Sequence, residues 1–216
     1  MIYKVIHTLT KSGITEISIV LGGESVGDFI RLLGDGKEFG ASFSYVYQQG
    51  AGGIAEALNL TRCIVAGEKV AVILGDNIFE DTFAEEVKQF DNSNDSSCML
   101  FLKEVSDPER FGVAELDGEG TILNIEEKPK IPKSNLCVTG LYFYDKNIFD
   151  VIDRVIKEIG YSSRGELEIT DVNNYYIKTS KTKSVIVNGF WSDAGTFRTL
   201  LKCSNFIKKQ HNNQIK

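Results

Sequence analysis

Patterns typical of β-strands alternate with patterns typical of α-helices along most of this chain. Strand patterns occupy residues 17–21, 43–47, 70–74, 98–102, 112–116, 122–126, 138–144 and 184–187. Helical patterns occupy residues 2–11, 28–33, 54–66, 82–90, 147–159, 169–178 and 197–209. Strands separated by helical crossovers pair in parallel and are covered by helices on both faces. The alternation therefore predicts an α/β fold, and the length fits a single domain over residues 1–216.

One pair of strand patterns departs from this alternation. Residues 112–116 and 122–126 flank Asp117-Gly118-Glu119-Gly120, a turn sequence typical of an antiparallel hairpin. We therefore predict a Rossmann-like sheet that is mixed, with mostly parallel strands.

Charge and hydropathy exclude several classes of partner. The chain has 30 Asp and Glu against 24 Lys and Arg, a formal net charge of -6, and most basic residues are scattered. A broad nucleic-acid-binding surface is therefore not expected. No apolar stretch approaches the roughly 20 residues that cross a bilayer, and the first residues do not resemble a signal peptide. We expect a soluble cytoplasmic protein without membrane association.

The four cysteines do not suggest a zinc site. Cys63, Cys98, Cys137 and Cys203 are widely spaced and lie in apolar contexts, and the chain has only two histidines. No short Cys/His spacing of the kind that binds zinc is present. We predict buried thiols.

Two aspartates follow strands that lie far apart in the sequence. Asp76 comes directly after the apolar run 70–74 and is followed by Asn77, whereas Asp193 lies in Trp191-Ser192-Asp193-Ala194-Gly195. Open α/β sheets bind ligands at the carboxyl ends of their strands. Two carboxylates at such ends can hold one hard divalent cation, which suggests phosphate chemistry.

Three further segments carry polar groups, and each has an ordinary structural explanation. Glu126-Glu127-Lys128-Pro129 ends a strand and would equally suit a solvated hairpin edge. Arg164, at the start of Arg164-Gly165-Glu166-Leu167-Glu168, could meet a phosphate or cap a neighbouring acid. Gln48-Gln49-Gly50-Ala51-Gly52-Gly53 could bring backbone amides to an anion at a helix start, or could be a flexible turn.

The order of the motifs is more specific than any one of them. The chain runs through LLGDG, LGDNIF, DPERFGVAELD, EEKP, VTGLYFYD, RGELEITDVN and WSDAGTF. In this order they resemble the sugar-nucleotide pyrophosphorylases, a nucleotidyltransferase family, and within it most closely the glucose-1-phosphate thymidylyltransferases. The resemblance covers nearly all 216 residues.

The resemblance implies a reaction and a role for each matching residue. Family members transfer a nucleotidyl group from a nucleoside triphosphate, here dTTP, to a sugar 1-phosphate, here glucose 1-phosphate, and release pyrophosphate. The matching residues are the Mg²⁺ ligands Asp76 and Asp193, the sugar-phosphate cations Lys128 and Arg164, the sugar-pocket residues Gly112, Glu127, Val138 and Tyr142, and the nucleobase contacts Gln48 and Gly53. Lys128, Arg164 and Asp76 are the expected catalytic residues, and a homo-oligomer is common in the family.

The start of the chain departs from the family pattern. Members begin with a strand, a glycine-rich loop G-G-x-G-T-R and a downstream Pro-Lys that together hold the triphosphate, whereas this chain opens with the helical pattern 2–11. In a doubly wound sheet the first strand is usually central, so its absence would leave neighbouring strands with unpaired backbone groups. We therefore expect a destabilised, rearranged or partnered chain with little or no transferase activity.

Two alternatives remain from the sequence. The chain could be a non-catalytic sugar-phosphate-binding or regulatory remnant, although such a binder would not need both Asp76 and Asp193. It could also be a transferase of a different nucleotide, such as a uridylyl or cytidylyl group.

Overall fold

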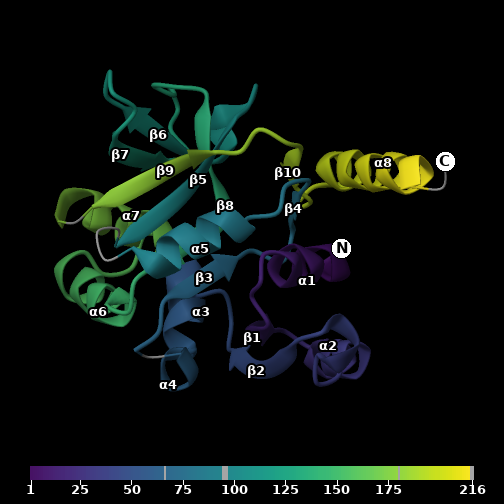
Figure 1. Ribbon diagram of the computed structural model, residues 1–216. Helices are drawn as coiled ribbons and strands as arrows, with labels where there is room; N and C mark the ends of the chain where they lie inside the picture. Colours follow the sequence, from purple (N-terminus) through teal and green to yellow (C-terminus); the bar gives the residue numbers. More distant parts are fainter. Residues whose placement is uncertain (66, 94–96, 180, 215–216) are drawn as a thin grey trace.

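The computed structural model describes residues 1–65, 67–93, 97–179 and 181–214 (Figure 1). The helices are α1 (Ile2–Lys11), α2 (Val26–Leu33), α3 (Ile54–Leu60), α4 (Arg62–Val65), α5 (Ala84–Asn92), α6 (Ile148–Glu158), α7 (Ile169–Thr179) and α8 (Phe197–Gln214), with short 3-10 turns η1 (Lys37–Phe39) and η2 (Pro108–Arg110). The strands are β1 (Glu16–Gly22), β2 (Ser42–Gln48), β3 (Val70–Ile73), β4 (Asn77–Phe79), β5 (Cys98–Glu104), β6 (Gly112–Leu116), β7 (Ile122–Glu127), β8 (Leu136–Tyr144), β9 (Thr182–Ile186) and β10 (Trp191–Asp193).

The largest sheet is built around β8. Its strand order is β7-β6-β8-β5-β9, and β3 also pairs with β8. Strand β8 is antiparallel to β3, β5 and β6, and among the described strands of this sheet only β5 and β9 pair in parallel. The prediction of a mixed sheet is confirmed, and β6 and β7 form the predicted antiparallel hairpin. The prediction of mostly parallel pairing is wrong, because β8 lies between β3 and β5 and runs opposite to both.

Helices cover both faces of this sheet. On one face, Leu100 and Tyr144 pack with apolar residues of α3, α6 and α7. On the other face, Phe101 and Phe143 pack with Phe90 of α5. Successive residues of β5 and β8 alternate between the two cores because side chains alternate along a strand. The strands in the middle of the sheet are therefore apolar on both faces.

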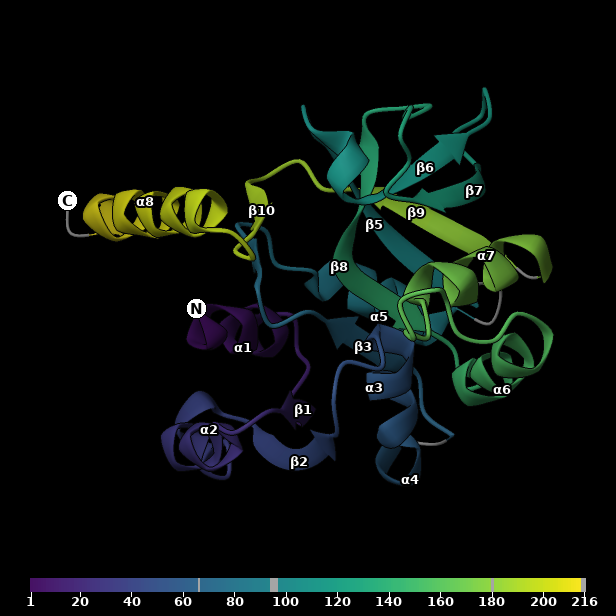
Figure 2. The ribbon, with the colours of Figure 1, turned by 180° about the vertical axis from the view of Figure 1, so that it is seen from behind.

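Strands β1 and β2 form a separate two-stranded parallel sheet. Among the described residues, no backbone ladder joins it to the six-stranded sheet. Helix α1 connects the two bodies through side chains, because Val5 packs with Ile78 whereas Ile6 packs with Ile19 of β1. In Figures 1 and 2 the β1–β2 sheet accordingly lies below β3 and beside α1.

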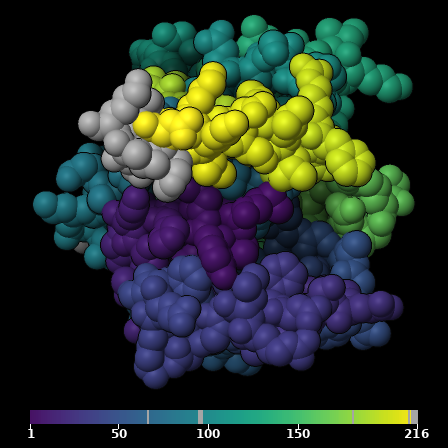
Figure 3. All heavy atoms as spheres, turned by 90° about the vertical axis from the view of Figure 1, so that its right-hand side faces the viewer, coloured from purple at the N-terminus to yellow at the C-terminus, as the bar shows by residue number. Residues whose placement is uncertain are grey.

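The chain ends in a helix that projects from the body. Helix α8 (yellow) lies alongside α1 (purple) in Figure 3, and Cys203 shares a small core with Val5. Phe197 at its start is almost fully exposed. Within the described part of the chain, no helix combines the length and apolar character needed to cross a bilayer.

The second two-stranded sheet was not predicted. Strands β4 and β10 pair antiparallel with Asp193 opposite Asn77. Three residues are too short to display a strand period, so sequence patterns could not indicate them. The prediction of buried cysteines is correct for Cys98, Cys137 and Cys203 and wrong for Cys63, which is exposed in α4.

Candidate active site

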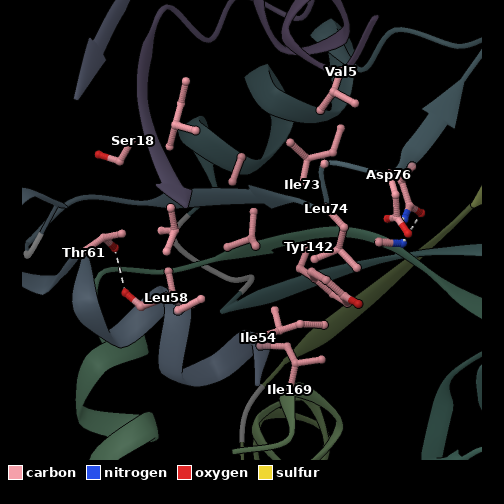
Figure 4. A pocket seen from close by; sticks show the side chains of 18 of the residues that line it. Val5, Ser18, Ile54, Leu58, Thr61, Ile73, Leu74, Asp76, Tyr142 and Ile169 are labelled. Atoms are coloured by element: carbon pink, nitrogen blue, oxygen red, sulfur yellow. Dashed lines mark hydrogen bonds between the residues drawn. The ribbon is translucent and has the colours of Figure 1, made fainter. Parts of the chain in front are cut away.

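A cavity of about 1840 Å³ is lined by residues of β1, β2, β3 and β8 and by several loops. Figure 4 shows Asp76 and Tyr142 in it, together with apolar side chains such as Leu58 and Ile73. The site residues named from the sequence all line this cavity, namely Gln48, Gly53, Asp76, Gly112, Glu127, Lys128, Val138, Tyr142, Arg164 and Asp193. They come from segments up to 145 positions apart in the chain, and the fold brings them to one concave surface.

Asp76 and Asp193 converge on one point. Asp76 follows β3, Asp193 ends β10, and the backbone N–H of Ala194 donates to the carbonyl of Asp76 at 2.8 Å. A Cβ atom placed on Gly195 would lie 3.3 Å from Oδ2 of Asp193 and 3.4 Å from Oδ2 of Asp76. Both oxygen atoms thus lie within 3.4 Å of the same position. Glycine at position 195 leaves that position free of a side chain.

Asn77 holds Asp76 in place. Its Nδ2 donates to Oδ1 of Asp76 at 2.8 Å. Its Oδ1 accepts from the backbone N–H of Gly140 at 2.9 Å and from Nε1 of Trp191 at 2.8 Å. Asn77 is buried, so this one amide ties β4, β8 and β10 to the carboxylate. Sequence reasoning noted the amide beside Asp76 but did not predict these contacts.

Arg110 is a site residue that sequence reasoning missed. It lies in η2, and its two terminal nitrogens donate to Asp107 at 3.0 Å and to Oδ2 of Asp193 at 3.1 Å. Its guanidinium also lies 4.9 Å from the ring centroid of Phe111. The hydrogen bond to Asp107, together with the charge of Asp193, raises the pKa of Arg110. The only sequence signal was its place in the DPERFG motif.

Glu127 and Lys128 lie where β7 ends. Oε2 of Glu127 accepts from Oγ1 of Thr170 at 2.7 Å, and Oε1 lies 3.6 Å from Nζ of Lys128. A Cβ on Gly112 would lie 3.4 Å from Oε2 of Glu127, so glycine there leaves room beside the carboxylate. Among the described residues, Lys128 is the one non-glycine residue with a positive φ, at 45°. Strain of this kind is concentrated at functional sites.

Arg164 is held by two carboxylates. One of its nitrogens lies 2.9 Å from Oε1 of Glu168 and 3.2 Å from Glu166. The hydrogen bond to Glu168 is the main cause that raises the pKa of Arg164. The structure therefore shows the acid-capping contact that the sequence left open. Glu166 and Glu168 line the cavity together with Arg164, so the two acids hold the guanidinium at the surface of the cavity.

Gln48 and Gly53 lie at the junction of β2 and α3. Nε2 of Gln48 donates to the carbonyl of Gly53 at 3.2 Å and to Glu56 at 2.7 Å. Gly53 has a φ of 95°, and a Cβ there would lie 2.5 Å from the carbonyl oxygen of Leu167. Close packing of two backbone segments therefore explains this glycine. It brings the Gln48 loop against the segment that carries Arg164.

Val138 and Tyr142 contribute the floor of the cavity. Both lie on β8 and belong to the core that α3 and α7 cover. Burial, with smaller contributions from Glu127 and Asp76, raises the pKa of Tyr142. Its hydroxyl therefore stays protonated at neutral pH and can act as a hydrogen-bond donor.

The two aspartates fit a divalent metal ion. Oδ2 of Asp76 accepts no hydrogen bond within the described part of the chain, while Oδ2 of Asp193 is shared by Arg110 and Gly195. Mg²⁺ is typically held by one or two carboxylates and by substrate phosphates. A pair of carboxylate oxygens beside an open position has this chemistry.

The chain is similar in sequence and in fold to several known proteins. A sequence profile of the family described as Nucleotidyl transferase matches residues 1–210. The glucose-1-phosphate thymidylyltransferase of Neisseria meningitidis serogroup A is 37% identical over 217 residues, which cover 99% of this chain and 74% of the relative. A Bacillus anthracis protein, provisionally named glucose-1-phosphate thymidylyltransferase, has a crystal structure in complex with sucrose. It is 45% identical to this chain with a TM-score of 0.87, and the match covers 95% of this chain and 81% of the Bacillus anthracis chain. A UDP-glucose pyrophosphorylase complexed with UDP-glucose shares the fold, with a TM-score of 0.78 at 22% identity over 97% of this chain and 86% of its own.

Proposed function

The chain belongs to the nucleotidyl transferase family, and on that basis we propose that it transfers a thymidylyl group from dTTP to glucose 1-phosphate. The products are dTDP-glucose and pyrophosphate. The names of the relatives at 37% identity support this choice of nucleotide and sugar. The observation that carries the proposal is the convergence of Asp76 and Asp193 on one point of the cavity that Glu127, Lys128 and Arg164 also line.

The sugar 1-phosphate would bind beside β7 and the start of α7. Lys128 and Arg164 are the cations that neutralise its phosphate, and the planar fork of Arg164 can pair two oxygens at once. Glu127, which Thr170 orients, can accept hydrogen bonds from sugar hydroxyls. Gly112 leaves space for the ring, and Val138 and Tyr142 form the surface beneath it.

The nucleotide would bind toward β2. Gln48, whose amide is fixed by Glu56 and Gly53, can read the edge of a pyrimidine. The sugar-phosphate oxygen attacks the α-phosphorus, the bond to the β-phosphate oxygen breaks, and pyrophosphate leaves. Asp76 and Asp193 would hold Mg²⁺, which would supply positive charge to offset the charge of the reacting phosphates. Asn77 contributes by holding the carboxylate of Asp76 in one orientation.

We further propose that the 216-residue chain catalyses this transfer slowly. Gln48 ends β2, whereas Asp76 follows β3, and no described backbone ladder joins the sheets that carry them. Among the described residues, the two halves of the site are therefore held together by side-chain packing and by isolated backbone contacts, such as the N–H of Leu167 donating to the carbonyl of Gly52 at 2.7 Å, and not by a strand ladder. A misplacement of about 1 Å can cost about 10²-fold in rate.

Pyrophosphate release with dTTP, glucose 1-phosphate and Mg²⁺ tests the proposal. We expect measurable turnover below that of the Neisseria meningitidis relative. Asp76→Asn and Asp193→Asn should each lower this turnover by about 10²- to 10³-fold, the usual scale for one electrostatic group. Asp28→Asn, on the exposed surface of α2, is the matched control and should leave the rate unchanged. Equal rates for all three variants would refute the assignment.

Calorimetry separates this proposal from a non-catalytic sugar-phosphate binder. The transferase should bind glucose 1-phosphate and, in the presence of Mg²⁺, dTTP. Heat from glucose 1-phosphate together with none from dTTP plus Mg²⁺ would favour the binding module. Competition between dTTP, UTP and CTP in the same experiment would identify the preferred base.

A further inference from the structure

The side-chain amide of Gln48 is held by two hydrogen-bond acceptors. Its Nε2 donates to the carboxylate of Glu56 at 2.7 Å and to the backbone carbonyl of Gly53 at 3.2 Å. An ionised carboxylate and a carbonyl accept hydrogen bonds and cannot donate them. Both hydrogens of the amide nitrogen are therefore used, and the amide can face these two partners only with its nitrogen.

The space that the carboxylate of Glu56 occupies depends on a glycine. A Cβ atom built on Gly52 would lie 1.6 Å from Oε2 of Glu56, so a side chain at position 52 would need the same space. Within the described part of the chain, Gln48 is the one side chain that donates to Glu56, and no lysine or arginine pairs with it. Glycine at position 52 thus lets Glu56 reach Gln48.

Backbone contacts fix the loop that carries these groups. The N–H of Leu167 donates to the carbonyl of Gly52 at 2.7 Å, and Gly53 packs against the carbonyl of Leu167. Glu56 lies in the first turn of α3, which begins directly after Gly53. The carboxylate, the carbonyl and the amide therefore belong to one anchored segment. The orientation of the amide is set before a ligand binds.

The oxygen of the same amide is the group left for a ligand. Among the described residues, no donor reaches Oε1 of Gln48. Gln48 lines the cavity, whereas Glu56 does not. Gly53 also lines the cavity, and its N–H donates to no acceptor in the described part of the chain. The wall of the cavity therefore offers a side-chain acceptor and, close by, a backbone donor.

Pyrimidine bases differ in what they offer to a fixed acceptor. The ring nitrogen N3 of uracil and thymine carries a hydrogen and has a carbonyl on each side, whereas N3 of cytosine is itself an acceptor. Opposite Oε1 of Gln48, the N3–H of uracil or thymine is matched, and a neighbouring carbonyl can accept from the N–H of Gly53. Cytosine would set its N3 against the amide oxygen, because its amine lies one position further along the edge. A site built to hydrogen-bond one group strongly rejects a ligand that lacks it.

We propose that Glu56 is a positioning residue that selects the base, because its carboxylate holds the Gln48 amide with the oxygen toward the ligand. The inference rests on the proposed nucleotidyl transfer and narrows its donor to a triphosphate of thymine or uracil. Cytidine nucleotides are rejected. Glu56 touches no substrate in this arrangement and acts through Gln48.

Calorimetric titration with UTP and CTP in the presence of Mg²⁺ tests the role of Glu56. The two nucleotides carry the same ribose and triphosphate and differ only at the edge of the base. We expect the 216-residue chain to bind UTP at least about tenfold more tightly than CTP, because CTP leaves the buried acceptor unpaired. Glu56→Gln puts an amide that can donate opposite Gln48, so the Gln48 amide can turn and the ratio of the two dissociation constants should fall at least about fivefold. Glu85→Gln makes the same change in the first turn of α5 and should keep the parent's ratio.

A pair of glycine variants moves the carboxylate without removing its charge. Gly52→Ala places a carbon on the position of Oε2 of Glu56, so the carboxylate must leave Gln48 and the ratio should fall as in Glu56→Gln. Gly118→Ala adds the same carbon in open space and should keep the parent's ratio. Because neither glycine has a left-handed φ, both variants should melt close to the parent.

The results separate this role from the proposed reaction, because the titration measures binding alone. Equal affinity of the parent for UTP and CTP, or a Glu56→Gln variant that keeps the parent's ratio, would overturn the role of Glu56. A chain that prefers UTP and loses this preference in Glu56→Gln, yet releases no pyrophosphate, would support the role of Glu56 and refute the transfer. Binding of neither nucleotide would refute both.

Discussion

Replacing Asn77 by alanine should destabilise the fold and disorder the candidate metal site together. The side-chain oxygen of Asn77 accepts from the backbone N–H of Gly140 and from Nε1 of Trp191, and Asn77 and Trp191 are buried. Alanine would leave both donors without an acceptor. An unsatisfied buried donor costs about 1–3 kcal/mol, so two of them cost about 2–6 kcal/mol. Typical domains have only about 5–15 kcal/mol of stability, so the loss is a large share of the total.

Urea unfolding at equilibrium measures this loss. We expect a lower midpoint with an unchanged slope, because the amount of surface exposed on unfolding stays the same. Asn77→Asp is the informative partner variant, because it keeps the acceptor oxygen and replaces the amine that donates to Asp76 with a second acceptor. Its stability loss should be smaller than that of Asn77→Ala, while its turnover should fall as much. Asn92→Ala, at an exposed position of α5, should change stability by less than about 0.5 kcal/mol.

The result that would refute this reasoning is specific. If Asn77→Ala loses less than about 1 kcal/mol, then the two donors find other partners and the amide is not the tie between the strands. If Asn77→Asp keeps full turnover, then the orientation of Asp76 does not depend on the amide.

Three further predictions concern single residues around the cavity. Arg110→Ala should lower the Mg²⁺ concentration needed for half of the metal-induced rise in melting temperature, because Asp193 loses a competing cation, and an increased Mg²⁺ requirement would contradict this. The substitution should lower the free energy of unfolding by less than about 1 kcal/mol, since the Arg110–Asp193 pair is partly exposed. Gly53→Ala should lower the free energy of unfolding, measured with urea, more than Gly120→Ala does. Both glycines have a positive φ, but of the two only Gly53 would bring the added carbon against another backbone segment. Equal losses of stability would argue against this explanation. Burial, and to a smaller extent the charges of Glu168 and Glu127, raise the pKa of Asp171 above 3.8. Ionisation of this carboxyl group therefore destabilises the folded chain as the pH rises above 3.8. Asp171→Asn should therefore stabilise the chain at pH 7 and not at pH 3 in urea unfolding, and an equal effect at both would refute the assignment.

The sequence predicted most elements because their patterns are local. The run 70–74 and the turn after Leu116 carry enough apolar periodicity and turn chemistry to place β3 and the β6–β7 hairpin. The position of β8 was not predictable in the same way. Its residues read as a buried strand in either direction, and only the three-dimensional order shows that it lies antiparallel between β3 and β5.

Some residues of the candidate site could be named from the sequence, and others could not. Asp76 and Asp193 could be named from the sequence because acids at strand ends are typical of phosphate chemistry. Arg110 could not, because its role depends on η2 carrying it to an aspartate 83 positions away. Gly53 was named as a nucleobase contact, and the structure adds that its conformation is fixed by Leu167. Contacts between distant segments have no signature in a single sequence.

The backbone of Lys128 has a consequence for how this protein can be improved. Glycine at this position would remove the left-handed strain and would make the chain more robust to heat, yet it would also delete the cation that faces the cavity. Directed evolution for thermal robustness should therefore be drawn to position 128, and selection for catalysis should oppose it there. If Lys128 is retained under simultaneous selection for thermal stability and for catalysis, then stability and function compete at this position.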